Sequence, residues 1–149
     1  MKSARSSFEY RDDRARDLHE VFKRELGLVP GENMLRLMQR VVNSPSRRFW
    51  VSEERAFRIV SSMMRRGLPP HCPALKREMF EEIARRAEQL LKVHPDWPLS
   101  RRVYYVVNGR APKFYISVKR AHAIICKERV RCEKERMLSL LRHCRSLSA

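Results

Sequence analysis

The sequence predicts an all-α protein made of two tandem, pseudo-repeated three-helix units. We expect the units to be helix-turn-helix-like and packed as one compact domain with a long basic C-terminal helix. Three observations predict this fold. The 149-residue chain contains only 4 Gly and is rich in strong helix formers. Its apolar residues recur at helical spacing over long stretches. A segment of about twenty residues also occurs twice.

The repeat lies at an offset of 65 residues. VVNSPSRRFWVSEERAFRIV (41–60) aligns without gaps with VVNGRAPKFYISVKRAHAII (106–125). The identical pairs are Val41/Val106, Val42/Val107, Asn43/Asn108, Phe49/Phe114, Ser52/Ser117, Arg55/Arg120, Ala56/Ala121 and Ile59/Ile124. We therefore predict a first three-helix repeat over 1–70. The second covers 71–149 and includes the basic C-terminal helical extension.

In the first unit, helices are predicted over 9–26 and 32–42, where apolar residues recur every three or four positions. An extended segment over 48–51 follows, because its aromatic and β-branched residues favour extended backbone. Ser52 is predicted to be the N-cap of a third helix, which ends before Gly67.

The second unit follows the same order. Helices are predicted over 74–93 and 99–107, and a second extended segment over 114–116. Ser117 is the predicted N-cap of the last helix, which covers about 118–143 and is strongly charged in its later part.

Each extended segment contains two adjacent aromatic residues, Phe49-Trp50 and Phe114-Tyr115. Neighbouring side chains of an extended segment point to opposite faces. We therefore expect the two Phe side chains in the core, and Trp50 and Tyr115 partly exposed. Their two alternative roles are to seal the junction or to stack on single-stranded bases.

The chain carries 33 Lys+Arg against 17 Asp+Glu, a formal net charge of +16. A charge of this size predicts a polyanionic partner, and the excess of Arg over Lys favours nucleic acid. No signal peptide or membrane-spanning segment is recognised, so we expect a cytoplasmic protein that does not bind membranes. The four scattered cysteines are expected to be reduced thiols.

The predicted nucleic-acid-binding residues lie around the third helix of each unit, which would enter the major groove. They are Arg47, Arg48, Arg55, Arg58, Arg65, Lys113, Lys119, Arg120 and Lys127. Two observations favour the alternative of a merely solvated basic face. The connector 43–51 is longer than the tight turn of a helix-turn-helix, and acidic residues begin the third helix of the first unit.

No metal site, cofactor or enzymatic activity is predicted. His122 and Cys126 share a helix face, but paired short spacings such as C-x2-C, which announce zinc sites, do not occur. A phosphate-binding Gly-rich loop, a nucleophile elbow and HExxH are equally missing from the sequence.

The stretches RFWVSEERA (48–56), LKREMF (75–80) and KFYISVKRA (113–121) resemble a family of short, basic, uncharacterised proteins of gut anaerobic bacteria and their mobile elements. The resemblance implies a bacterial or phage-like setting and no particular activity.

Together, the charge, the repeat and the motifs predict a non-catalytic nucleic-acid-binding protein, with double-stranded DNA as its ligand. The alternative is a protein-interaction or assembly component of a phage or mobile element. In that case the basic face meets an acidic protein, with Trp50 and Tyr115 as contact anchors.

Overall fold

The computed structural model describes residues 3–148, with side chains from residue 10 onward, and this range contains six α-helices and no β-strand. The helices are α1 (Ser3–Leu28), α2 (Met34–Val42), α3 (Glu53–Arg66), α4 (Ala74–Val93), α5 (Leu99–Asn108) and α6 (Val118–Leu147). The predicted all-α class is confirmed. The predicted helices are all present, and α6 continues four residues beyond the expected end at 143.

The helix starts follow from local chemistry. The Ser52 hydroxyl accepts the backbone N–H of Arg55 (3.3 Å), and the Ser117 hydroxyl accepts that of Arg120 (3.2 Å). Each cap satisfies a backbone donor that the first turn of a helix leaves without a partner. Both predicted N-caps are confirmed.

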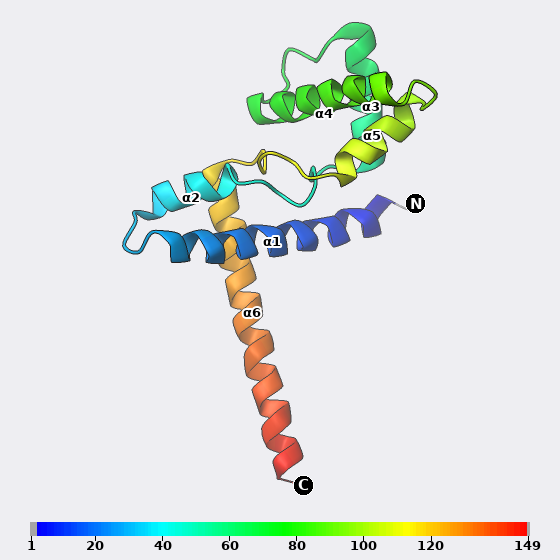
Figure 1. The fold of residues 1–149 in the computed structure, drawn as a ribbon. Helices are drawn as coiled ribbons and strands as arrows, with labels where there is room; N and C mark the ends of the chain where they lie inside the picture. Colours follow the sequence, from blue (N-terminus) through cyan, green and yellow to red (C-terminus); the bar gives the residue numbers. More distant parts are fainter. Residues whose placement is uncertain (1–2, 149) are drawn as a thin grey trace.

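The helices pack as two groups of three (Figure 1). The terminal group consists of α1, α2 and α6, and the central group consists of α3, α4 and α5. The terminal core includes Leu18, Phe22, Met38, Val41, Phe114, Ala121 and Ile125, and the central core includes Phe49, Ala56, Val60, Phe80, Ile83, Val103 and Val107. In the part of the chain that the structure describes, α3 makes no contact with α1 or α2.

This grouping differs from the consecutive three-helix units expected over 1–70 and 71–149. Residues 1–2 and 149 of these units lie outside the described range. Here α3 packs with the helices of the second half, and α6 packs with those of the first half. Because α2 and α3 do not touch within the described chain, their connection is not a helix-turn-helix. The physical reason is the length of the connector 43–52, which lets α3 pack against α4 and α5 and not against α2.

The two connectors, 43–52 and 109–117, run antiparallel and are joined at one point. Ser46 and Ala111 exchange two backbone hydrogen bonds, with N···O distances of 3.0 and 3.1 Å. On either side, the Phe49 N–H donates to the carbonyl of Val107 (3.1 Å), and the Phe114 N–H donates to that of Val42 (3.0 Å). Ser46 and Ala111 correspond at the offset of 65, and the two flanking bonds are equivalent to each other at the same offset.

The aromatic pairs of the connectors link the two cores. Phe49 is buried in the central core, whereas its neighbour Trp50 packs against the terminal core. Phe114 is buried in the terminal core, and its neighbour Tyr115 packs against the central core. The predicted burial of the two Phe and the partial exposure of Trp50 and Tyr115 are confirmed. Each connector therefore contributes one aromatic side chain to each core.

The second half of α6 projects away from both groups (Figure 1). Among the described residues of α6, those that are buried are Ala121, Ile125 and Glu128, all in its first half. Apolar side chains farther along are exposed, among them Val130, Met137 and Leu141. The first three turns of α6 therefore fix it to the terminal group.

Candidate nucleic-acid interface

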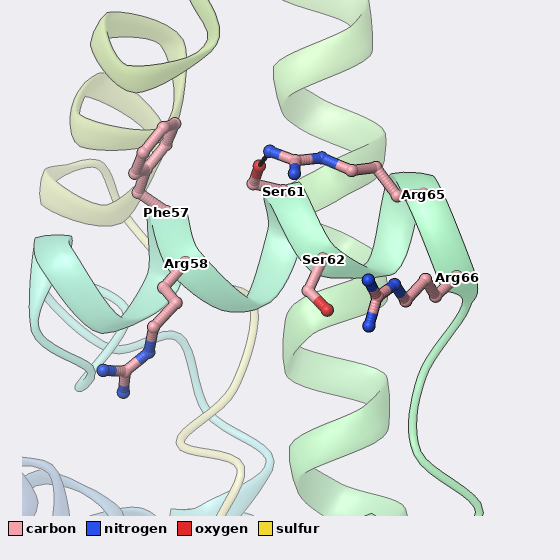
Figure 2. A pocket seen from close by; sticks show the side chains of 6 residues that line it. All are labelled: Phe57, Arg58, Ser61, Ser62, Arg65 and Arg66. Atoms are coloured by element: carbon pink, nitrogen blue, oxygen red, sulfur yellow. Dashed lines mark hydrogen bonds between the residues drawn. The ribbon is translucent and has the colours of Figure 1, made fainter.

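The outer face of α3 carries three of the predicted residues, Arg55, Arg58 and Arg65, all of them exposed. Arg66, which lies in the last turn, is also exposed, although it is not among the predicted residues. A basic residue there is ordinarily explained by the helix dipole, which is why it gave no functional signal. Figure 2 shows Arg58, Ser62 and Arg66 along one side of α3.

Four α3 arginines form what we call the α3 basic face: Arg55, Arg58, Arg65 and Arg66. Within the described chain, none of them lies within ion-pair distance of a carboxylate. Arg65 donates to the Ser61 hydroxyl (2.9 Å), a neutral acceptor (Figure 2). A shallow hollow of about 340 Å³, lined by Phe57, Ser61, Ser62 and three of these arginines, lies along the face.

The corresponding residues on α6 lie in the other helix group. Lys119, Arg120 and Lys127 are exposed, and α6 makes no contact with α3 within residues 3–148. Lys119 borders an apolar hollow of about 410 Å³ whose other lining residues include Met34, Leu35 and Met38. The predicted residues on α3 and α6 therefore form two separate basic surfaces.

Three predicted residues of the connectors are bound to the protein itself. Arg47 forms an ion pair with Glu20 at 2.6 Å. Lys113 forms one with Glu78 at 2.5 Å. Arg48 donates to the carbonyls of Phe49 (3.2 Å) and Val51 (3.0 Å), and its guanidinium carbon lies 5.8 Å from the Trp50 ring centre. These contacts hold the connectors in place. Because each charged group already has partners in the protein, it is less available to bind a ligand.

Besides the surfaces on α3 and α6 and the connector residues, basic side chains also surround Tyr10 on α1. The Tyr10 ring packs edge-on against Trp50 with centroids 5.3 Å apart, and the Arg48 guanidinium lies 5.6 Å from the Tyr10 ring centre. The Tyr10 hydroxyl and the Arg14 Nε are buried, and neither has a hydrogen-bond partner within the described chain. Sequence reasoning missed Arg14, because nothing in the helical pattern of α1 marks it.

Basic residues of both helix groups act electrostatically on this region. Burial raises the pKa of Tyr10 above its usual value, although Arg14, Arg48 and Arg55 act to lower it. Burial also lowers the pKa of the Arg14 guanidinium, and Arg120 lowers it further. The charge of Arg55 therefore acts on Tyr10, and the charge of Arg120 acts on Arg14.

Some described arginines elsewhere are neutralised by acids. Arg40 pairs with Glu25 and Glu32, and Arg86 pairs with Glu82 at 2.7 Å. Ion pairs of this kind are typical of the solvated face that we considered as the alternative. Within the described chain, the four arginines of the α3 basic face have no such acidic partner, and neither have Lys119, Arg120 and Lys127 on α6.

Comparison with protein families, with curated proteins and with solved structures finds no match to this chain. Within the described residues, no helix combines the length and the apolar composition that crossing a bilayer requires.

Proposed function

We propose that this protein binds nucleic acid, with double-stranded DNA as the ligand, and catalyses no reaction on it. The observation that carries the proposal is the α3 basic face, four exposed arginines without a carboxylate partner in the described chain. The net charge of +16 supports it, because such a charge is stabilised by a polyanion. Arginine also suits phosphate, since its planar fork donates two parallel hydrogen bonds.

The expected binding energy is mainly electrostatic. Each phosphate that a basic side chain neutralises releases counterions and contributes about −0.9 to the slope of log K against log salt. Four arginine–phosphate contacts predict a slope of about −3.6. Affinity should then fall about a hundredfold between 50 and 200 mM salt.

The test is a fluorescence-anisotropy titration of a labelled duplex at these two salt concentrations. The double variant R58Q/R65Q should bind at least about tenfold more weakly at low salt, with a shallower salt slope. The control R16Q/R85Q removes the same charge at exposed arginines that pair with Asp13 and Glu82. Equal losses in both double variants, or no binding by the folded wild type at low salt, would contradict the proposal.

A second candidate function is protein interaction, and the projecting half of α6 is the observation that favours it. Trp50 and Tyr115 pack against the two cores, which makes them poor contact anchors. Met137, Leu140 and Leu141 instead expose apolar surface beside basic residues, which suits an acidic partner. Capture of an acidic protein that survives nuclease treatment and is lost in M137Q/L141Q would favour this function.

We also infer that the chain contains two copies of one unit that have exchanged their third helices. The sequence repeat and the paired hydrogen bonds of the connectors, which correspond at the same offset, support this inference. The bacterial or mobile-element setting rests on the resemblance of the motifs. A cytoplasmic location rests on the four free thiols, since disulfides are rare there.

A further inference from the structure

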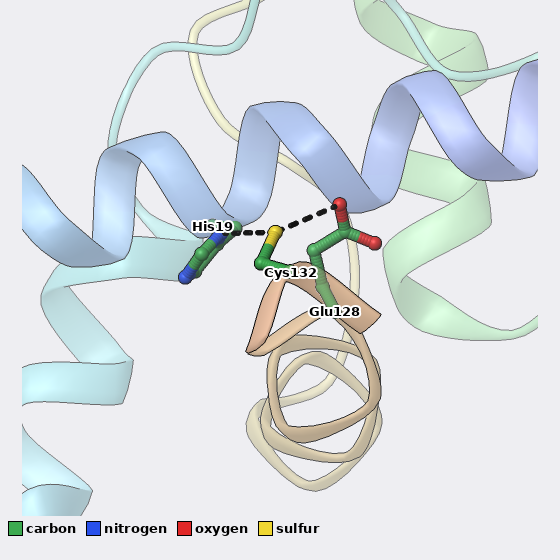
Figure 3. A group of neighbouring side chains, drawn as sticks. All are labelled: His19, Glu128 and Cys132. Carbon is green, nitrogen blue, oxygen red and sulfur yellow. Dashed lines mark hydrogen bonds between the residues drawn. The ribbon is translucent and has the colours of Figure 1, made fainter. Parts of the chain in front are cut away.

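Three side chains with metal-binding chemistry meet where α6 crosses α1, away from the α3 basic face (Figure 3). They are His19 of α1 and Glu128 and Cys132 of α6. The Cys132 Sγ lies 4.0 Å from the His19 Nδ1 and 3.9 Å from the Glu128 Oε1. One ligand atom from each residue lies within 4.8 Å of the other two.

The donor set is that of a zinc site. Zinc in proteins is held by thiolate sulfur, imidazole nitrogen and carboxylate oxygen at about 2.0–2.3 Å. In a tetrahedron with such bonds, the ligand atoms are about 3.3–3.8 Å apart. The two separations at the sulfur need to shorten by about half an ångström, and the separation between the His19 and Glu128 ligand atoms, which is within 4.8 Å, needs to reach the same range. Glu128 and Cys132 are four residues apart, so one face of α6 presents both.

Two of the three groups already have the protonation state that a metal requires. Burial, aided by Lys23, lowers the pKa of His19, so its imidazole is neutral at pH 7 and retains a lone pair. The hydrogen bond from Arg131 lowers the pKa of Glu128, so its carboxylate is ionised. Cys132 loses its proton when the metal binds, as thiol ligands do.

Arg131 competes for Glu128 and has a second partner. Its Nε lies 3.1 Å from the Glu128 Oε2, while its Nη1 lies 2.5 Å from the Glu135 Oε1. Glu135 is exposed and can hold the guanidinium when Glu128 turns to a metal. The thiolate and the carboxylate balance the charge of a divalent cation, although the nearby Lys23 and Arg129 reduce its affinity.

We propose that His19, Glu128 and Cys132 bind a zinc ion, with a fourth position open to water, and that this ion clamps α1 to α6. The sequence predicts no such site, because His19 and Cys132 are 113 residues apart and become neighbours only through the packing of α1 against α6.

A second His–Cys pair of the chain serves as a control for the proposed zinc site. His122 and Cys126 lie on α6 with the same spacing of four and a separation of 3.7 Å between the Cys126 Sγ and the His122 Nε2. Both are exposed, and in the described chain they belong to no group of three ligands. Two ligands are too few for a structural zinc site.

The test is the alkylation rate of each cysteine of the full-length protein, measured by mass spectrometry with and without Zn²⁺. We expect zinc to slow the alkylation of Cys132 at least about tenfold, because a metal-bound thiolate is a poor nucleophile. Cys72, Cys126 and Cys144 are expected to change less than about twofold. Protection of Cys126 instead, or of no cysteine, would overturn the proposal.

Variants test the ligand set with a second readout. Co²⁺ should give a thiolate-to-metal absorption band with the wild type and with H122A. The band should be lost with H19A and C132S, and weakened with E128Q. Circular dichroism at the same concentrations shows whether each variant is folded. A folded H19A or C132S protein that keeps the wild-type band would contradict the assignment.

Discussion

Phe49 and Phe114 are the two residues on which the cores depend most directly. Each is a large side chain on a connector, almost fully enclosed by helices of one group. Replacing either benzyl side chain by the methyl group of alanine leaves a cavity that the surrounding helices fill only in part. Since the positions correspond in the repeat, the two substitutions should have similar effects.

Phe49→Ala and Phe114→Ala should each lower the free energy of unfolding by about 3–5 kcal/mol. Urea denaturation followed by circular dichroism measures the change. Tyr105→Ala is the matched control, because Tyr105 is an aromatic residue that is 61% exposed, and it should cost less than about 1 kcal/mol. A large loss for one Phe and none for the other would contradict their equivalence.

Residue-level signals predicted much of the local structure. Ser52 and Ser117 were predictable as caps because a hydroxyl before a helical pattern satisfies the first-turn N–H groups. The burial of Phe49 followed from alternation in an extended segment. Arg14 and His19 gave no such signal, because their importance depends on which distant residues pack beside them.

At the scale of elements, α6 is one continuous helix with two different environments. Its first half contributes buried side chains to the terminal core, whereas none of its described residues beyond Glu128 is buried. A helix without tertiary contacts is only marginally stable in water. The projecting half should therefore contribute little to the stability of the fold.

Deletion of residues 136–149 should change the free energy of unfolding by less than about 1 kcal/mol. Thermal or urea denaturation checks this expectation, and the loss of helical signal should match only the residues removed. Deletion from residue 121 onward is the contrasting variant, because it removes Ala121 and Ile125 and should abolish cooperative unfolding. A strong destabilisation by the shorter deletion would show that the projecting half packs on the protein.

At the scale of the whole molecule, each helix group contains helices from both halves of the sequence. The exposed turn after α3 offers a place to cut the chain without touching either core. Pro69 and Pro70 are exposed there, so a protease site can be inserted after Pro70. The two fragments would then be 1–70 and 71–149.

After cleavage at this site, the two fragments should remain associated on native size-exclusion chromatography. Their association buries both cores, whereas separation would expose them to water. A protease site inserted after Glu135 is the control, because the released end of α6 should elute alone. Separation of 1–70 from 71–149 under native conditions would mean that the halves pack as consecutive units.

The sequence predicted the helices but not which of them pack together, and the similarity of α3 and α6 explains why. Ala56 and Ala121, and Val60 and Ile125, present the same apolar pattern on α3 and α6. Local periodicity therefore gives no preference for packing α3 or α6 in one core or the other.

The packing of α6 with α1 and α2 also determines when each core can form during synthesis of the chain. Domains commonly fold from the N-terminus as the ribosome extends the chain. Here α1 and α2 must wait for Ala121 and Ile125, which are made about eighty residues after α2. The central group can close earlier, once α5 has emerged. In a nascent chain of this protein, the central group thus forms first, and α6 packs against α1 and α2 last.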